Sequence, residues 1–216
     1  MIELCPARQL AGNFENLKGR VLSSLNGRAE AGFVVAFTSC EESEGVTSTS
    51  VNFAASLASQ GERNVLLIDG DLKRPELHHY FEKKEKKQAP DETQGEANLV
   101  WRTLRANRNL DVLLVRQRQD NPMQVFETAL FKKRLGMVRE RYDCVVIDCP
   151  PLNEANGAMV LAGRADAVIL VVEAERVRRE VIQRALSVLE DSGAHVLGVV
   201  LNKRRYPIPR FIYKML

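Results

Sequence analysis

Short apolar runs alternate with helix-like segments along most of the chain. Each run is a nearly continuous series of valine, isoleucine and leucine, typical of strands that are covered on both faces. The runs are Phe33–Thr38, Asn64–Asp69, Leu110–Val115, Cys144–Asp148, Ala167–Val172 and Val196–Leu201. Apolar residues recur at helical spacing in Asn13–Leu25, Thr49–Ser59, Phe131–Arg141 and Val177–Glu190. This alternation predicts an α/β fold with a mainly parallel sheet and helices on both faces.

The length favours a single domain spanning residues 1–216. Residues 1–30 are predicted to form an N-terminal helical extension that includes the first helix. Residues 82–97 are rich in lysine and acidic residues and nearly free of aliphatic ones, so we expect a charged mobile loop there. Residues 203–216 form a predicted basic tail.

Composition narrows the class of protein. The chain has 31 basic and 28 acidic residues, and a balance this small excludes a nucleic-acid footprint over the whole surface. No apolar run approaches the roughly 20 residues that span a bilayer. The first residues lack the plan of a secretory signal, and the four cysteines show no zinc spacing. We therefore expect a cytoplasmic protein.

A candidate phosphate-binding loop follows the first predicted strand. Residues 39–48 read SCEESEGVTS and precede a helix, in the order of a P-loop: strand, glycine-rich turn, G-K-[ST], helix. Such a loop wraps phosphates with backbone N–H groups, neutralises them with a lysine and holds magnesium with a hydroxyl. Gly45 and Thr47 occupy the expected places, whereas Val46 stands where the lysine belongs.

Acidic residues end two further predicted strands. Asp69 and Asp71 follow the second strand, and Asp148 ends a later one. Two carboxylates at a strand end suit magnesium binding or activation of a nucleophile. An apolar run that ends in an acid is typical of a Walker B strand, whose aspartate reaches the magnesium shell. Ligands of open α/β sheets bind at the carboxyl ends of the strands, which is where these acids fall.

Together these motifs resemble the bacterial tyrosine kinase family, whose cytoplasmic P-loop domains are tied to capsule and exopolysaccharide synthesis. The resemblance rests on the order of TSCEESEGVTSTSVNFAASLASQG, NVLLIDGDLKRP, YDCVVIDCPP, ADAVILVVEA and VLGVVLNKRR. It runs from about Asn13 to the C-terminus, and Asn121-Pro122 falls where the family has N-P. The family belongs to the wider group of MinD/ParA-type ATPases with a deviant Walker A motif, which implies a P-loop NTPase fold.

The resemblance also implies roles for individual residues. Asn202 would lie near adenine, and Asp69, Asp71 and Asp148 would be the catalytic acids of an active member. Mg²⁺ would be held by Thr47, Asp71 and Asp148. The residues implied at the phosphates are Ser43, Glu44, Gly45, Val46, Thr47 and Ser48. Family members work with a membrane-spanning polysaccharide co-polymerase, which stimulates ATP use and tyrosine autophosphorylation.

The missing lysine is the largest departure from the family pattern, P-G-E-G-K-S. Val46 replaces a cation, and Glu41 and Glu42 lie just upstream. Unit charges about 4 Å apart interact by roughly 4 kcal/mol at an effective dielectric near 20. Triphosphate binding should therefore weaken by several kcal/mol if both acids point inward. If they face water, only the contribution of the lysine is lost, and Lys73 or Arg74 could also reach in.

Two further departures concern phosphorylation and assembly. The tail has two separated tyrosines, Tyr206 and Tyr213, in place of a tyrosine cluster. The E-x-x-R-x-x-R helix that relatives pack between ring subunits is only partly kept in Glu15–Val21. The sequence therefore leaves open whether the chain forms a homo-oligomer. The mixture of basic and aromatic residues in the tail leaves peripheral membrane association open as well.

We therefore predict a cytoplasmic regulatory or scaffolding component of exopolysaccharide or capsule synthesis and export, with impaired or absent ATPase and kinase activity. ATP or ADP with Mg²⁺ would bind weakly at most, and no nucleic acid is expected. The partner would be the cytoplasmic segment of a co-polymerase or an active paralogous kinase. The alternatives are an active tyrosine autokinase with a substitute cation and a MinD/ParA-type positioning ATPase.

Overall fold

The structure, a computed structural model, describes residues 8–25, 32–81, 91–94, 100–115, 118–154 and 156–204. Its helices are α1 (Arg8–Leu25), α2 (Val46–Ser59), α3 (His78–Phe81), α4 (Pro122–Phe126), α5 (Ala129–Arg141), α6 (Asn156–Ala162) and α7 (Arg179–Asp191). Its strands are β1 (Phe33–Ser39), β2 (Val65–Asp69), β3 (Asp91–Gln94), β4 (Val100–Asn107), β5 (Leu110–Val115), β6 (Cys144–Asp148), β7 (Ala167–Glu173) and β8 (Val196–Asn202).

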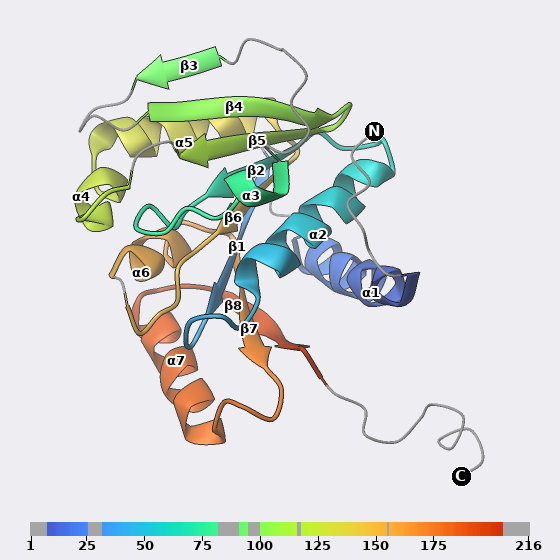
Figure 1. Cartoon of the computed structure of the whole chain (residues 1–216), viewed down its shortest axis with the longest axis vertical. Coiled ribbons are helices and arrows are strands. Elements are labelled where there is room, and N and C mark those ends of the chain that lie inside the picture. Colours follow the sequence, from blue (N-terminus) through green and yellow to red (C-terminus); the bar gives the residue numbers. More distant parts are fainter. Residues whose placement is uncertain are drawn as a thin grey trace.

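The strands form one sheet in the order β3-β4-β5-β2-β6-β1-β7-β8 (Figure 1). From β5 to β8 each strand pairs with its neighbour in parallel register, whereas β3 and β4 extend the sheet through antiparallel pairs. The predicted α/β fold with a mainly parallel sheet is confirmed. Because β2, β6, β1, β7 and β8 are successive neighbours, their carboxyl ends meet at one edge of the sheet.

Helices cover both faces of the sheet, as predicted (Figure 1). On one face α1, α2 and α3 pack on strand side chains such as Val35 and Val146. On the other face α4, α5, α6 and α7 pack on the neighbouring side chains Val34 and Val145. Successive side chains of a strand point to opposite faces, so strands with two covered faces need no polar alternation.

The edge of the sheet formed by β3 and β4 differs from the sequence prediction. A loop is predicted throughout residues 82–97, but Asp91–Gln94 pair with β4, so the prediction is wrong for this stretch. Residues 82–90 and 95–97 lie outside the described part. The apolar pattern does not reveal β4 because two arginines, a threonine and an asparagine interrupt the apolar residues of Val100–Asn107. A two-residue turn at Arg108 and Asn109 joins β4 to β5. Two strands separated by so short a turn form a hairpin, which the sequence prediction did not include.

The ends of the chain are described only in part. The predicted N-terminal extension contains α1, and residues 1–7 and 26–30 lie outside the described residues. Of the predicted basic tail only Lys203 and Arg204 are described, so Tyr206 and Tyr213 lie outside as well. Within the described part, none of the helices is both long enough and apolar enough to cross a bilayer.

Candidate functional site

The loop between β1 and α2 has a backbone suited to cradling an anion. Gly45, directly before α2, has a left-handed conformation with φ of 89°. Ser43 also has a positive φ, 61°, at a position where the family pattern has glycine. The first N–H groups of a helix have no partner within the helix, so the start of α2 offers donors to a phosphate.

Buried contacts hold this loop from behind. Glu44 is fully buried, and its carboxylate accepts hydrogen bonds from the backbone N–H of Glu41 (2.9 Å) and of Glu173 (3.1 Å). The Nδ2 of Asn202 donates to the carbonyl of Glu44 (2.9 Å). A Cβ on Gly45 would lie only 2.2 Å from this Nδ2. The ends of β7 and β8 therefore fix the loop, and the position requires glycine.

Two buried aspartates stand beside the loop. Asp69 and Asp148 face each other in the register of β2 and β6, and both are almost fully buried. Burial raises the pKa of Asp148 to about 7, although hydrogen bonds from Thr47 and Ser50 act to lower it. Burial, and then the charge of Asp148, raise the pKa of Asp69 well above its ordinary value. Both carboxyl groups thus resist ionisation in the folded chain.

A third acid, Asp71, lies half-buried beyond the end of β2. Its Oδ1 accepts hydrogen bonds from the backbone N–H of Lys73 (3.2 Å) and Arg74 (3.0 Å). Burial raises the pKa of Asp71, and these two hydrogen bonds oppose the rise. The charge of Asp71 also acts on Asp69 and Asp148. The structure therefore brings the three predicted acids together.

The donor set around Asp148 fits a magnesium ion that arrives with a phosphate. Asp148 Oδ1 is buried and has no hydrogen-bond partner among the described residues, while Thr47 is hydrogen-bonded to the same carboxyl group. Mg²⁺ is usually bound by one or two carboxylates together with substrate phosphates. The described residues contain no cluster of three or more histidine, cysteine or acidic side chains that could hold a metal by themselves. Thr47, Asp71 and Asp148 would hold the ion, with phosphate oxygens completing its shell.

A cavity of about 210 Å³, here called the cradle cavity, lies at the loop and these acids. Its lining residues are Ser39, Glu42, Ser43, Glu44, Gly45, Val46, Thr47, Ser48, Asp71, Arg74, Glu76, Tyr80, Asp148, Cys149, Pro150, Pro151 and Lys203. Five of these side chains are acidic and two, Arg74 and Lys203, are basic. This surplus of acids is unfavourable for a triphosphate.

The upstream acids face arginines at the surface. Arg74 forms ion pairs with Glu42 and with Glu154, one at each terminal nitrogen. Glu41 is paired with Arg176 at 3.4 Å. The sequence left open whether Glu41 and Glu42 point into the loop or face water. The structure supports the second option, in which these acids add little repulsion and only the attraction of the missing lysine is lost. Arg74 lines the cradle cavity but already has two carboxylate partners.

Lys203 is the other cation of the cradle cavity. Its Nζ donates to the carbonyl of Ser43 and lies 3.2 Å from Glu173 Oε2. The sequence prediction places Lys203 in a basic tail, but its side chain lies at the rim of the loop. Val46 is the first residue of α2, has 9% of its surface exposed and packs with the core of that face. Among the described residues, the place that the P-loop pattern gives to lysine is therefore occupied by an aliphatic side chain.

Most predicted site residues line the cradle cavity, and two do not. Asp69 lies buried behind it, and Asn202, expected near adenine, is hydrogen-bonded to the loop instead. Sequence reasoning missed Glu76, Tyr80 and the inward position of Lys203. The available signal was that these residues closely follow β2 and β8, whose ends carry predicted site residues.

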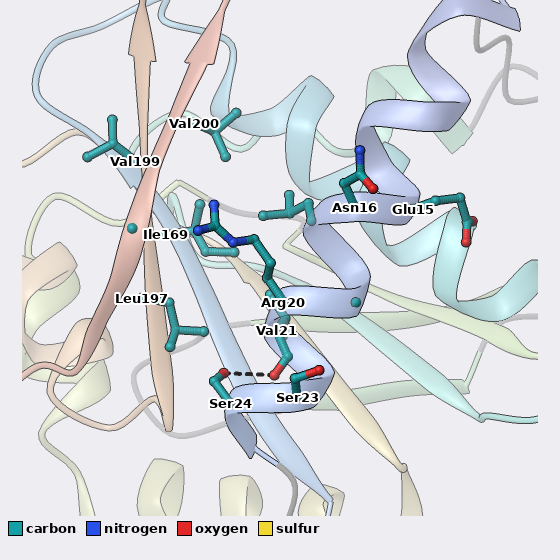
Figure 2. A pocket seen from close by; sticks show the side chains of 13 residues that line it. Glu15, Asn16, Arg20, Val21, Ser23, Ser24, Ile169, Leu197, Val199 and Val200 are labelled. Atoms are coloured by element: carbon teal, nitrogen blue, oxygen red, sulfur yellow. Dashed lines mark hydrogen bonds between the residues drawn. The ribbon is translucent and has the colours of Figure 1, made fainter.

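A second, larger hollow of about 670 Å³ lies between α1 and β8. Figure 2 shows Arg20 extending from α1 towards β8, whose side chains Leu197 and Val200 lie on the facing side. It shares no lining residue with the cradle cavity, and its β8 wall is aliphatic. This hollow is therefore separate from the candidate nucleotide site.

Known proteins resemble this chain over most of its length. Residues 34–193 match a family model described as an AAA domain. Tyrosine-protein kinase CpsD of Streptococcus agalactiae serotype III is 31% identical over 172 residues, which cover 79% of this chain and 74% of the relative. The crystal structure of the chimerical protein CapA2B2 has a TM-score of 0.76 at 21% identity, covering 95% of this chain and 89% of the other.

A further solved structure, the VpsO kinase domain, has a TM-score of 0.70 at 27% identity, covering 93% of this chain and all (100%) of that domain. These similarities confirm the predicted P-loop NTPase fold. They also agree with the family resemblance that the motifs at the strand ends indicate.

Proposed function

This chain belongs to the family of bacterial tyrosine-protein kinases, and we propose that it is a member with impaired or absent ATPase and kinase activity. It would serve as a regulatory or scaffolding component of exopolysaccharide or capsule synthesis and export in the cytoplasm. The chain retains the fold of the family, the loop before α2 and the acids at the strand ends. This supports a regulatory role that depends on the shape of a nucleotide-binding domain and not on its chemistry.

The observation that carries this proposal is the aliphatic side chain of Val46 at the start of α2. Phosphoryl transfer depends on positioning and on neutralising the charge of the phosphates. The two cations of the cradle cavity, Arg74 and Lys203, are each bound to carboxylates. A triphosphate would have to displace one of these ion pairs or remain without a cationic side chain at its terminal group.

The partners that we propose for this chain are those implied by the family resemblance. We propose that the chain binds the cytoplasmic segment of a membrane polysaccharide co-polymerase or an active paralogous kinase. A ring of identical subunits is less favoured, because Glu15 is ion-paired with Lys18 and accepts a hydrogen bond from Ser56 within its own subunit. Recruitment to the inner face of the membrane would then depend on the partner.

A second candidate is an active tyrosine autokinase in which Lys203 serves as the substitute cation. It is favoured by one contact, the hydrogen bond from Lys203 Nζ to the Ser43 carbonyl, which places an ammonium group at the rim of the loop. Release of this bond would free the cation for a phosphate.

Autophosphorylation of the purified chain with Mg²⁺ and ATP tests both candidates, with phosphotyrosine detected by mass spectrometry. The first candidate predicts little or none in the wild type and the same amount in Lys203→Met. The second predicts phosphotyrosine that is lost in Lys203→Met and in Asp71→Asn but kept in Lys73→Met, the matched control. Lys73 suits this control because its exposed side chain does not line the cradle cavity. Phosphotyrosine that forms in the wild type and is lost in Lys203→Met would refute the first candidate.

A further inference from the structure

A basic pocket lies at the end of the sheet opposite the cradle cavity. It has a volume of about 190 Å³ and is called here the arginine pocket. Its lining residues are Asn64, Arg105, Arg108, Asn109, Asp111, Arg141 and Tyr142. Asn64, Asn109 and Tyr142 lie just before β2, β5 and β6, so the pocket sits at the amino ends of these parallel strands. The cradle cavity lies at their carboxyl ends.

The arginine pocket has a surplus of positive charge. Three guanidinium groups line it, against the one carboxylate of Asp111. Arg108 and Arg141 form no ion pair with any acid of the described residues. The next acid along the chain, Asp143, accepts a hydrogen bond from the backbone N–H of Asn64 (2.7 Å). The two arginines are therefore available to an anion from solution.

The floor of the pocket is rigid and buried. Asp111 is 6% exposed and Tyr142 is 8% exposed, and the Tyr142 hydroxyl donates to Asp111 Oδ2 (2.8 Å). The other carboxylate oxygen of Asp111 is paired with Arg105 Nε, and Arg105 Nη1 donates to the carbonyl of Arg108 (3.1 Å). These contacts fix the guanidinium of Arg105 and the backbone that carries Arg108.

The third arginine is positioned by an aromatic ring. The Cζ of Arg141 lies 5.7 Å from the centroid of the Tyr142 ring, within the range of a cation–π contact. The side chains of Arg105 and Arg141 thus approach the buried Tyr142–Asp111 pair from the hairpin and from the end of α5. Three arginines thus line a pocket whose floor is buried and held by hydrogen bonds, an arrangement suited to binding an anion.

We propose that the arginine pocket binds a phosphate group, either free phosphate or a phosphate monoester. The planar guanidinium matches the oxygens of a phosphate in bidentate geometry, and arginine is the residue most suited to this recognition. Neutral donors from Asn64 and Asn109 stand at the same pocket. The site lies at the far end of the sheet from the cradle cavity and shares no lining residue with it.

An NMR titration of the full chain tests this proposal. Inorganic phosphate is added at constant ionic strength, with chloride as the reference anion, and backbone amides are followed. We expect saturable shifts at Asn64, Asn109 and Tyr142. Shifts confined to Gly45 and Thr47 of the cradle cavity, or no saturable shift, would overturn the proposal.

Paired variants separate specific binding from general charge. Arg108→Ala with Arg141→Ala should weaken phosphate binding by about tenfold or more, because two charge-assisted contacts are lost. The matched control, Arg178→Ala with Arg179→Ala, removes the same charge at exposed positions near the start of α7 and should leave the affinity unchanged. Equal weakening in both pairs would overturn the proposal.

A second titration with phenyl phosphate distinguishes the two sources. Tighter binding of phenyl phosphate than of inorganic phosphate, with the same amides shifting, supports a phosphate carried on another molecule. Tighter binding of inorganic phosphate supports the free ion. Binding of neither at these amides contradicts the proposal.

Discussion

Replacing Val46 by lysine should restore nucleotide binding if the loop is a true phosphate cradle. Val46 lines the cradle cavity from the first residue of α2, so an ammonium group there can approach the terminal phosphate. At about 4 Å the attraction is roughly 4 kcal/mol at an effective dielectric near 20. Asp71 and Asp148 offset part of it, since both line the same cavity. We expect a net gain of about 2–3 kcal/mol, or roughly 30- to 150-fold in the affinity for MgATP.

The assay is a fluorescent-ATP titration of Val46→Lys beside Val46→Met, which has similar length but no charge. Both variants lose packing of a largely buried valine, so each should cost about 1 kcal/mol in the free energy of unfolding. Urea unfolding of both variants checks that they remain folded. The reasoning is refuted if Val46→Lys binds MgATP no more tightly than Val46→Met while both are folded.

Three further predictions concern the loop and the buried acids. Gly45→Ala should destabilise the fold by about 2 kcal/mol or more, because its Cβ would meet Asn202, whereas Gly61→Ala, also at positive φ but with open space around it, should cost less in the same urea assay. Ser43→Gly should stabilise the fold by about 0.5–1 kcal/mol in thermal unfolding, because the residue has a φ of 61°; a loss of stability would show that the serine side chain is needed. The pKa of Asp148 is raised to about 7 in the folded chain, so wild-type stability should fall as pH rises from about 4 through 7. Asp148→Asn lacks this loss and should gain stability relative to wild type between pH 5 and pH 8; an equal pH dependence in both would contradict the burial of this carboxyl group.

The parallel core of the fold follows directly from its sequence pattern. Strands such as β6 and β7 are continuous apolar runs because both faces of the sheet are covered, and the acids that end β2 and β6 lie at the edge that carries the candidate site. The antiparallel edge is harder to predict. In β4, Arg105 lies opposite Asp111 in the register, so its charge is balanced by a partner that only the hairpin brings near.

The sequence predicts most of the residues that line the cradle cavity, but not the interactions among them. Asp71, Asp148 and the loop are close in space because they end neighbouring strands, which follows from the motif order. The ion pairs of Arg74 and Lys203 link residues far apart in the sequence, for example Arg74 with Glu154. Whether a cation near the loop is free or engaged therefore depends on tertiary contacts that no local pattern contains.

Calorimetric titration of the unaltered chain with ATP and Mg²⁺, together with measurement of phosphate release, tests the central claim most directly. The loss of about 2–3 kcal/mol from a site of about 1 μM predicts a dissociation constant of roughly 30–150 μM and no turnover above the rate in buffer. A dissociation constant near 1 μM with measurable release of phosphate would contradict the account.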